Sequence, residues 1–274
     1  MISFPDIPGI EIHPTPHVLR ETLRLELGPP MQLDSNAQLA IDRKWSELRN
    51  INPRLHDGPI LLAEFSYASG SRATGSPRFA ATRADLAVIA RPATYKLLAT
   101  ATHLNTHVRA LGVQGIVTAH DASGEEHLLL GRRGSEVRIY QGLWENAPSG
   151  TVMPPNSSSS FLDQTHFVSA IIDEGLEETG LNLSNSSISW IAMLDDAQAH
   201  SLDVVLKLQM QETIDPRAVP CPADDTHAWE YAATAWTPLA TLHAWAEQNA
   251  HAVSPPTLAL TRWLTESATP AFSP

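Results

Sequence analysis

The sequence predicts an α/β protein in which a mixed sheet carries helices on both faces, an α/β/α sandwich, preceded by a β-rich α+β N-terminal domain. From Leu111 onward, apolar strand-like segments alternate with segments of helical spacing, which is typical of this architecture. The pattern before Leu111 is different, so we expect domains at residues 1–109 and 110–274. With 274 residues, 43% of them hydrophobic, the chain can bury a large core in one or two domains.

The N-terminal domain is expected to contain one clear helix. Residues 1–35 are rich in proline and are expected to be extended. A helix is predicted over residues 37–48, where apolar residues recur at helical spacing, with Ser35 or Asn36 as its N-cap and its end at Asn52-Pro53. The other expected segments are a strand at 60–67, a Gly/Ser loop at 69–77, a short strand or helix at 85–89 and a connection at 95–107.

The C-terminal domain is expected to hold the main sheet. It opens with two strands, 112–119 and 127–132, which a turn at 121–124 joins into a hairpin. The later predicted elements are strands at 188–194, 204–210 and 229–236 and helices at 238–245 and 256–264.

One further helix carries the most informative residues of the chain. Glu174, Glu177 and Glu178 are spaced so that their carboxylates share one helical face. Three clustered negative charges repel one another, so the cluster makes sense if a divalent cation lies among them. Mg²⁺, or Mn²⁺ in its place, is held by such hard oxygen ligands. The spacing therefore predicts a metal site on this helix.

The remaining residues of this helix are assigned to packing and to its end. Val168, Ile172 and Leu176 fall on a different face from the glutamates and are expected to pack inward. Gly180 suits the left-handed residue that ends a helix.

This segment resembles the helical half of a Nudix box, which ends in R-E-U-x-E-E-x-G-U, where U is aliphatic. The three glutamates and the closing Gly180-Leu181 match, whereas Asp173 stands in the place of the arginine and Gly175 in the place of the first aliphatic residue. The segments upstream also resemble Nudix hydrolases, with an apparent insertion before the box: Leu128–Arg133, Tyr140–Trp144, Pro148–Gly150 and the insertion Pro154–Ser160.

Sparser positions are similar to the Nudix branch that hydrolyses UDP-sugars, namely Ala40–Trp45, Pro53–Pro59 and Leu111–Val113. Members of that branch carry a β-rich N-terminal region and a divergent box without the usual arginine. The resemblance implies Mg²⁺-dependent cleavage of UDP-glucose or UDP-galactose to UMP and a sugar 1-phosphate. Two alternatives stay open: hydrolysis of ADP-ribose or a dinucleotide, and a catalytically inactive Nudix-fold module that binds nucleotides.

Roles follow for the acidic residues. The resemblance implies Glu177 and Glu178 as metal ligands, and Glu174 as a ligand or as the acceptor of the water's proton. Glu230 lies before a late strand, where Nudix enzymes often place an additional base or ligand. The alternative for Glu230 is a carboxylate at the rim of the site.

Four other residues are candidates for binding the substrate. Arg132 and Arg133 leave a core strand, where a guanidinium could bind a phosphate, although each could instead form a surface ion pair. Trp144 could stack on a base or sugar, or pack in the core. Lys207 could face the cleft or lie on a solvated strand face.

Composition limits the class of partner. The net charge of −12 disfavours nucleic acid, so a nucleoside diphosphate-sugar or a related small molecule is expected. The single Cys221, the absence of a signal-like start and the lack of an apolar run long enough for a bilayer predict a soluble cytoplasmic protein that does not bind membranes. A homodimer is left open. Zinc is disfavoured, since His103 and His107 lack a supporting motif.

Overall fold

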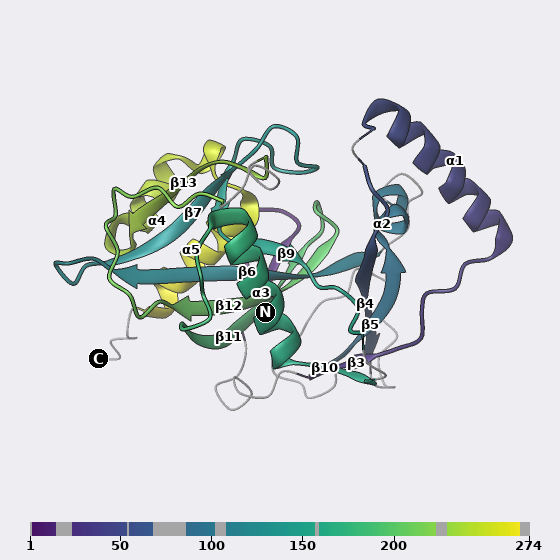
Figure 1. Ribbon diagram of the computed structural model, residues 1–274, viewed down its shortest axis with the longest axis horizontal. Helices are drawn as coiled ribbons and strands as arrows, with labels where there is room; N and C mark the ends of the chain where they lie inside the picture. Colours follow the sequence, from purple (N-terminus) through teal and green to yellow (C-terminus); the bar gives the residue numbers. More distant parts are fainter. Residues whose placement is uncertain are drawn as a thin grey trace.

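A computed structural model describes residues 2–14, 24–53, 55–67, 86–101, 108–156, 159–222 and 229–268. Within these ranges the chain forms one mixed sheet of 13 strands and five α-helices (Figure 1). The predicted mixed α/β class is therefore confirmed. The predicted loop at 69–77 and the residues His103 and His107 lie outside the described part of the chain.

The predicted helices and strands occur in the predicted order, but a helix at 95–101 lies where a connection was expected, and the strands at 144–146, 149–151 and 161–163 were not predicted. The helices are α1 (Ser35–Ile51), α2 (Tyr95–Ala101), α3 (Gln164–Thr179), α4 (Leu239–Gln248) and α5 (Pro255–Ala268). The strands are β1 (Ile2–Ser3), β2 (Ile10–Pro14), β3 (Arg24–Leu27), β4 (Pro59–Tyr67), β5 (Leu86–Thr94), β6 (Arg109–His120), β7 (Glu126–Arg133), β8 (Trp144–Asn146), β9 (Ser149–Thr151), β10 (Phe161–Asp163), β11 (Ser187–Asp196), β12 (Ser201–Gln209) and β13 (Tyr231–Pro238).

The long strand β6 organises the sheet, whose main order is β1-β2-β11-β12-β6-β4-β5-β3-β10. β12 runs parallel to β6, β7 pairs with the end of β6 in the predicted hairpin, and β9 pairs with its beginning. β2 lies beside β11, and β4 beside β6, so strands from both predicted domains share one sheet. The division at residue 109 stays a prediction.

Two apolar cores lie on opposite faces of the main sheet. Because successive strand residues point to opposite sides, Val113 and Val117 of β6 join the core that contains Phe167 of α3, whereas Ile116 joins the core that contains Leu242 of α4. The second core also includes residues of α5. Figure 1 shows α3 lying across the sheet, with α4 and α5 grouped at one end of the molecule. These three helices and the sheet make the predicted sandwich.

The ends of the helices confirm one prediction and correct another. Gly180 ends α3 with a φ of 71°, the left-handed conformation that was expected of it. The N-cap of α1 is Asp34, not Ser35 or Asn36, because its carboxylate accepts hydrogen bonds from the N–H groups of Asn36 and Ala37.

The buried face of α3 also differs from the prediction. Phe167, Ile171 and Gly175 are buried, and Leu176 is 52% exposed, so the assignment of Leu176 to the inward face was wrong. Val168 and Ile172 are partly buried at the edge of the core. Glu178, not Leu176, points to the sheet, and this shows that the helix is rotated from the predicted orientation. Among the described helices, none is long and apolar enough to cross a membrane.

Candidate active site

A cavity of about 480 Å³ lies where α3 meets the first half of β6 and the strand β9. We call it the carboxylate cavity, because seven of its lining residues are acidic: Glu145, Glu174, Glu177, Glu178, Asp196, Asp203 and Glu230. Arg133, Arg138 and Tyr140 also line it. The structure thus brings Glu230 and Arg133 to the three glutamates of α3, across more than 40 residues of sequence on either side.

Close contacts with β9 position two of the glutamates of α3, Glu174 and Glu178. The carboxylate of Glu178 is buried and accepts a hydrogen bond of 2.9 Å from the N–H of Ser149 in β9. Gly150 leaves room for Glu174, since a Cβ at residue 150 would lie 1.7 Å from the Glu174 Oε1. Gly175 lets the helix approach Leu183, whose Cδ1 would be 2.6 Å from an added Cβ. The glycine in place of the consensus aliphatic residue therefore has a packing role.

The buried carboxyls of the cavity resist ionisation. Burial, followed by repulsion from Glu230 and Glu177, raises the pKa of Glu174 to about 8. Burial also raises the pKa of Glu178, with further contributions from Glu174 and from a hydrogen bond with Glu230. Carboxyl groups with raised pKa values ionise more readily when a bound cation offsets their negative charge.

Arg133 supplies positive charge to the same cavity. Its Nη1 forms an ion pair with the buried Glu145 of β8, which also accepts hydrogen bonds from the Tyr231 hydroxyl at 3.0 Å and the Ser149 Oγ at 3.3 Å. Burial lowers the pKa of Arg133, but Glu145 and Tyr231 outweigh it, so the pKa is raised overall. Arg133 therefore remains a cation beside the acidic residues.

A second acidic group forms another wall of the cavity. Burial raises the pKa of Asp203 to about 7 and also raises the pKa of Asp196. The hydroxyl of Tyr140 donates a hydrogen bond of 2.7 Å to Asp196. Tyr140 has a φ of 56°, a conformation that is uncommon for a bulky residue and that often occurs at functional sites. Tyr140, Asp196 and Asp203 thus line the cavity with polar side chains that are hydrogen-bonded within the protein.

Three predicted binding residues do not line this cavity. Arg132 is exposed, because it alternates with Arg133 along β7 and points to the other side of the strand. Trp144 packs edge-on against Trp245 of α4, with ring centroids 6.3 Å apart, and belongs to the second core. The Nζ of Lys207 lies 3.7 Å from the Glu126 Oε1. The proposal that these three residues bind substrate gains no support from their placement.

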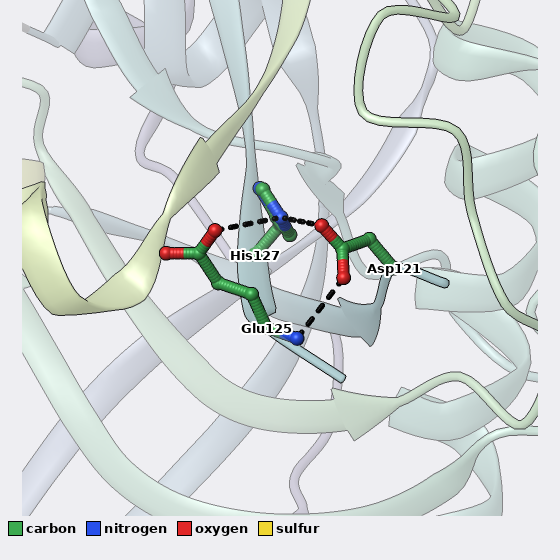
Figure 2. A group of neighbouring side chains, drawn as sticks. All are labelled: Asp121, Glu125 and His127. Atoms are coloured by element: carbon green, nitrogen blue, oxygen red, sulfur yellow. Dashed lines mark hydrogen bonds and ion pairs between the residues drawn. The ribbon is translucent and has the colours of Figure 1, made fainter. Parts of the chain in front are cut away.

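Outside the carboxylate cavity, an aspartate, a glutamate and a histidine place their potential metal-ligand atoms closer together than the glutamates of α3 do. Asp121, Glu125 and His127, at the β6–β7 turn, place candidate ligand atoms within 4.8 Å of one another, and no other group in the described ranges does so. Figure 2 shows these side chains. Asp121 accepts hydrogen bonds from the Ser123 and Glu125 N–H groups and pairs with the His127 Nε2 at 3.1 Å. These bonds account for the cluster as a stabilised turn, at the far end of β6 from the carboxylate cavity.

Comparison with known proteins gives a distant similarity. No family model and no curated protein matches the chain. Among solved structures it is similar to the Nudix domain of Shewanella oneidensis NrtR in complex with ADP-ribose, with 17% identity over 64% of this chain and 97% of that chain and a TM-score of 0.42. It is also similar to a Nudix hydrolase from Alicyclobacillus acidocaldarius, with 12% identity, 56% and 90% of the two chains covered and a TM-score of 0.39.

A Nudix hydrolase from Nitrosomonas europaea gives comparable values, with 15% identity over 58% of this chain and 89% of that chain and a TM-score of 0.37. These three solved structures are thus one Nudix domain and two Nudix hydrolases. At these TM-scores the similarity decides neither family membership nor substrate, so the chemistry has to be inferred from the residues of the cavity.

The contact between Gly150 and Glu174 gives a first prediction. We expect Gly150→Ala to lower the rate of any reaction that depends on Glu174 about 100-fold, because the new methyl group must displace the Glu174 carboxylate, and a shift of about 1 Å in a reacting group has effects of that size. Thermal unfolding should change little, since the end of a flexible side chain can move. Gly58→Ala, where nothing lies within 4 Å of the added Cβ, is the matched control. A wild-type rate in Gly150→Ala would show that the position of Glu174 is unimportant.

The raised pKa values give a second prediction, for stability without metal. Below the unfolded-state pKa of about 4.5, Glu174 and Glu178 are protonated in both states and contribute no penalty. As the pH rises towards 8, the unfolded chain releases these protons first, so the free energy of unfolding falls. Thermal unfolding in EDTA should therefore show lower stability at pH 8 than at pH 5, and Mg²⁺ should restore much of the loss at pH 8.

The contribution of these two residues can be separated from that of the other acids. The double variant Glu174→Gln, Glu178→Gln has no carboxyl to ionise at either position, so its stability should fall less between pH 5 and pH 8 than that of the wild type. Parallel losses in the two proteins would contradict the assignment.

Proposed function

We propose that the protein hydrolyses the diphosphate of a nucleoside diphosphate linked to another moiety, with Mg²⁺ as its cofactor. The observation that carries this proposal is the meeting of Glu174, Glu177, Glu178 and Glu230 in one cavity beside Arg133. Acidic residues repel the phosphates of a substrate, so a cavity with this lining can receive a diphosphate only when a cation offsets the charge.

The donor set of the cavity fits Mg²⁺ or Mn²⁺. Both ions prefer carboxylate oxygens, and Glu174, Glu177 and Glu178 would supply them. Glu178 is 2% exposed, and its buried carboxyl is destabilised as an anion, which a cation would reverse. When bound, the ion would neutralise phosphate charge and favour attack by water.

The protein's own residues would handle the proton and the phosphates. Glu230, which interacts with Glu174 and Glu178, would accept a proton from the attacking water. The water oxygen bonds to one phosphorus, the P–O–P bridge breaks, and its oxygen leaves with the other phosphate. Arg133, held by Glu145, would orient the diphosphate through its charge.

Within this class we propose a UDP-sugar as the substrate, giving UMP and a sugar 1-phosphate. The sequence resemblance to the UDP-sugar branch supports this choice. Tyr140, Asp196 and Asp203 add support, because carboxylates and a phenol are suitable partners for the hydroxyl groups of a hexose.

A binding module without turnover is the second candidate. Asp173 occupies the place of the box arginine and is exposed, so it supplies no positive charge to the glutamates. Such a protein would bind nucleotides and release no product.

A panel of UDP-glucose, UDP-galactose, ADP-ribose, NADH and dinucleoside polyphosphates, each with and without Mg²⁺, tests the proposal. We expect Mg²⁺-dependent release of UMP from the UDP-sugars. Preferred cleavage of another member of the panel would support hydrolysis of a diphosphate but reject the UDP-sugar as the substrate. Release of no product from any member at high protein concentration would favour the binding module.

A further inference from the structure

A second cavity, of about 630 Å³, adjoins the carboxylate cavity. It lies between the helices α1 and α2 and the segment that follows β7, and we call it the aromatic cavity. Tyr95, Arg138 and Trp229 line both cavities, so the two cavities meet at these residues. A ligand with two chemically different ends that extends past these residues would occupy both cavities.

The walls of the aromatic cavity differ in chemistry from those of its neighbour. Among the described residues, seven acidic residues line the carboxylate cavity, whereas Glu136 is the only acidic one that lines the aromatic cavity. Apolar and aromatic surfaces come from α1, α2, the segment between them and the segment after β7, and Asn52, His56 and Gln141 add hydrogen-bonding groups. An apolar slot with a few polar groups suits a planar heterocycle, which has apolar faces and a polar rim.

Trp229 is the residue best placed to contact such a ring. It is 47% exposed, although large aromatic side chains are usually well covered. Trp229 directly precedes Glu230, so the two Cα atoms are about 3.8 Å apart, and the indole begins next to the catalytic carboxylates.

The backbone of this pair is held firmly. The N–H of Gly134 donates a hydrogen bond of 2.8 Å to the carbonyl of Glu230, and a Cβ at Gly134 would lie 2.0 Å from the Trp229 carbonyl oxygen. Gly134 follows Arg133, so this hydrogen bond ties the backbone of Trp229 and Glu230 to the end of the strand that carries Arg133.

We propose that the aromatic cavity binds the nucleobase of the substrate, with the Trp229 indole against the ring and Tyr95 beside it. The diphosphate then lies in the carboxylate cavity. The identity of the ligand rests on the proposed function, whereas the binding of a base at Trp229 does not require turnover. On this account the region before residue 109 has a defined role, because α1 and α2 build the wall that recognises the base.

Calorimetric titration of the full chain in Mg²⁺ with UMP, AMP and ribose 5-phosphate tests this proposal, since none of them contains the bond to be cleaved. We expect UMP or AMP to bind at least tenfold more tightly than ribose 5-phosphate. Trp229→Ala should weaken binding of that nucleotide about 5- to 150-fold, the usual range for loss of a base–aromatic stack. Binding of ribose 5-phosphate should stay unchanged, and Trp229→Phe should retain most of the nucleotide affinity.

The control is Leu39→Ala, which removes an apolar side chain that is 64% exposed on α1 and does not line either cavity. It should bind nucleotides like the wild type. The proposal is overturned if folded Trp229→Ala and Tyr95→Leu both bind nucleotides with wild-type affinity, or if ribose 5-phosphate binds as tightly as UMP and AMP. Nucleotide binding that depends on Trp229, in a protein that cleaves nothing in the substrate panel, would support the base site and reject the hydrolase. Cleavage by Trp229→Ala with an unchanged KM would support the hydrolase and reject the base site.

Discussion

Glu178→Gln is expected to lower kcat by about 1,000-fold while the protein remains folded. Glu178 is the most deeply buried of the α3 carboxyls, and its side chain is fixed by the N–H of Ser149. The amide keeps the size of the side chain and an oxygen for this hydrogen bond, but it loses the negative charge that a divalent cation requires. Metal-dependent stabilisation of a transition state is worth several kcal/mol, and each 1.36 kcal/mol corresponds to tenfold in rate.

The same substitution should raise stability when no metal is present. Because burial raises the pKa of Glu178, its ionised form is unfavourable in the folded protein at neutral pH, and a neutral amide avoids that penalty. Wild-type protein should gain thermal stability from Mg²⁺, and Glu178→Gln should gain less. The control is Glu212→Gln, at an exposed residue that lines neither cavity. A kcat for Glu178→Gln within twofold of the wild type would remove this residue from the reaction.

Arg133→Gln is expected to lower the free energy of unfolding by about 3–5 kcal/mol, since it leaves a buried carboxylate without its counter-charge. Glu145, its partner, is 5% exposed, accepts a hydrogen bond from the Tyr231 hydroxyl and lines the same cavity as Glu178. Urea unfolding monitored by circular dichroism measures this loss. The second variant Arg133→Gln, Glu145→Gln should recover part of the stability, because it also removes the isolated charge.

The neighbouring residue provides a matched control. Arg132→Gln changes the same side chain on the same strand, but at an exposed position, and should alter stability by no more than about 0.5 kcal/mol. Equal effects at the two arginines would show that the ion pair with Glu145 contributes nothing specific.

Local spacing was sufficient to predict the helix of glutamates and its end. Glu174, Glu177 and Glu178 do line one cavity, and Gly180 ends α3 as expected. Local spacing could not give the rotation of α3 on the sheet, which depends on the absence of side chains at Gly150 and Gly175. For this reason Leu176 was assigned to the wrong face.

The residues that sequence reasoning missed depend on contacts between distant strands. Asp203 looks like an outward-facing acid within a strand, yet it lies opposite Gly112 of β6, where a Cβ would be 2.1 Å from its Oδ1. Glu145 is likewise a single acid beside a tryptophan, and only the pairing of β8 with β7 brings it near Arg133. Gly112 was a weak signal for Asp203, because a glycine within a strand often marks the close approach of another group.

The central claim, that the carboxylates of α3 hold a divalent cation, is tested most directly by anomalous diffraction from crystals soaked in Mn²⁺. We predict an anomalous peak in the carboxylate cavity, in contact with the side chains of Glu178 and at least one other glutamate of α3, which disappears in crystals of Glu178→Gln. A fully occupied peak at Asp121, Glu125 and His127 with none in the carboxylate cavity, or no peak at either place, would contradict the account.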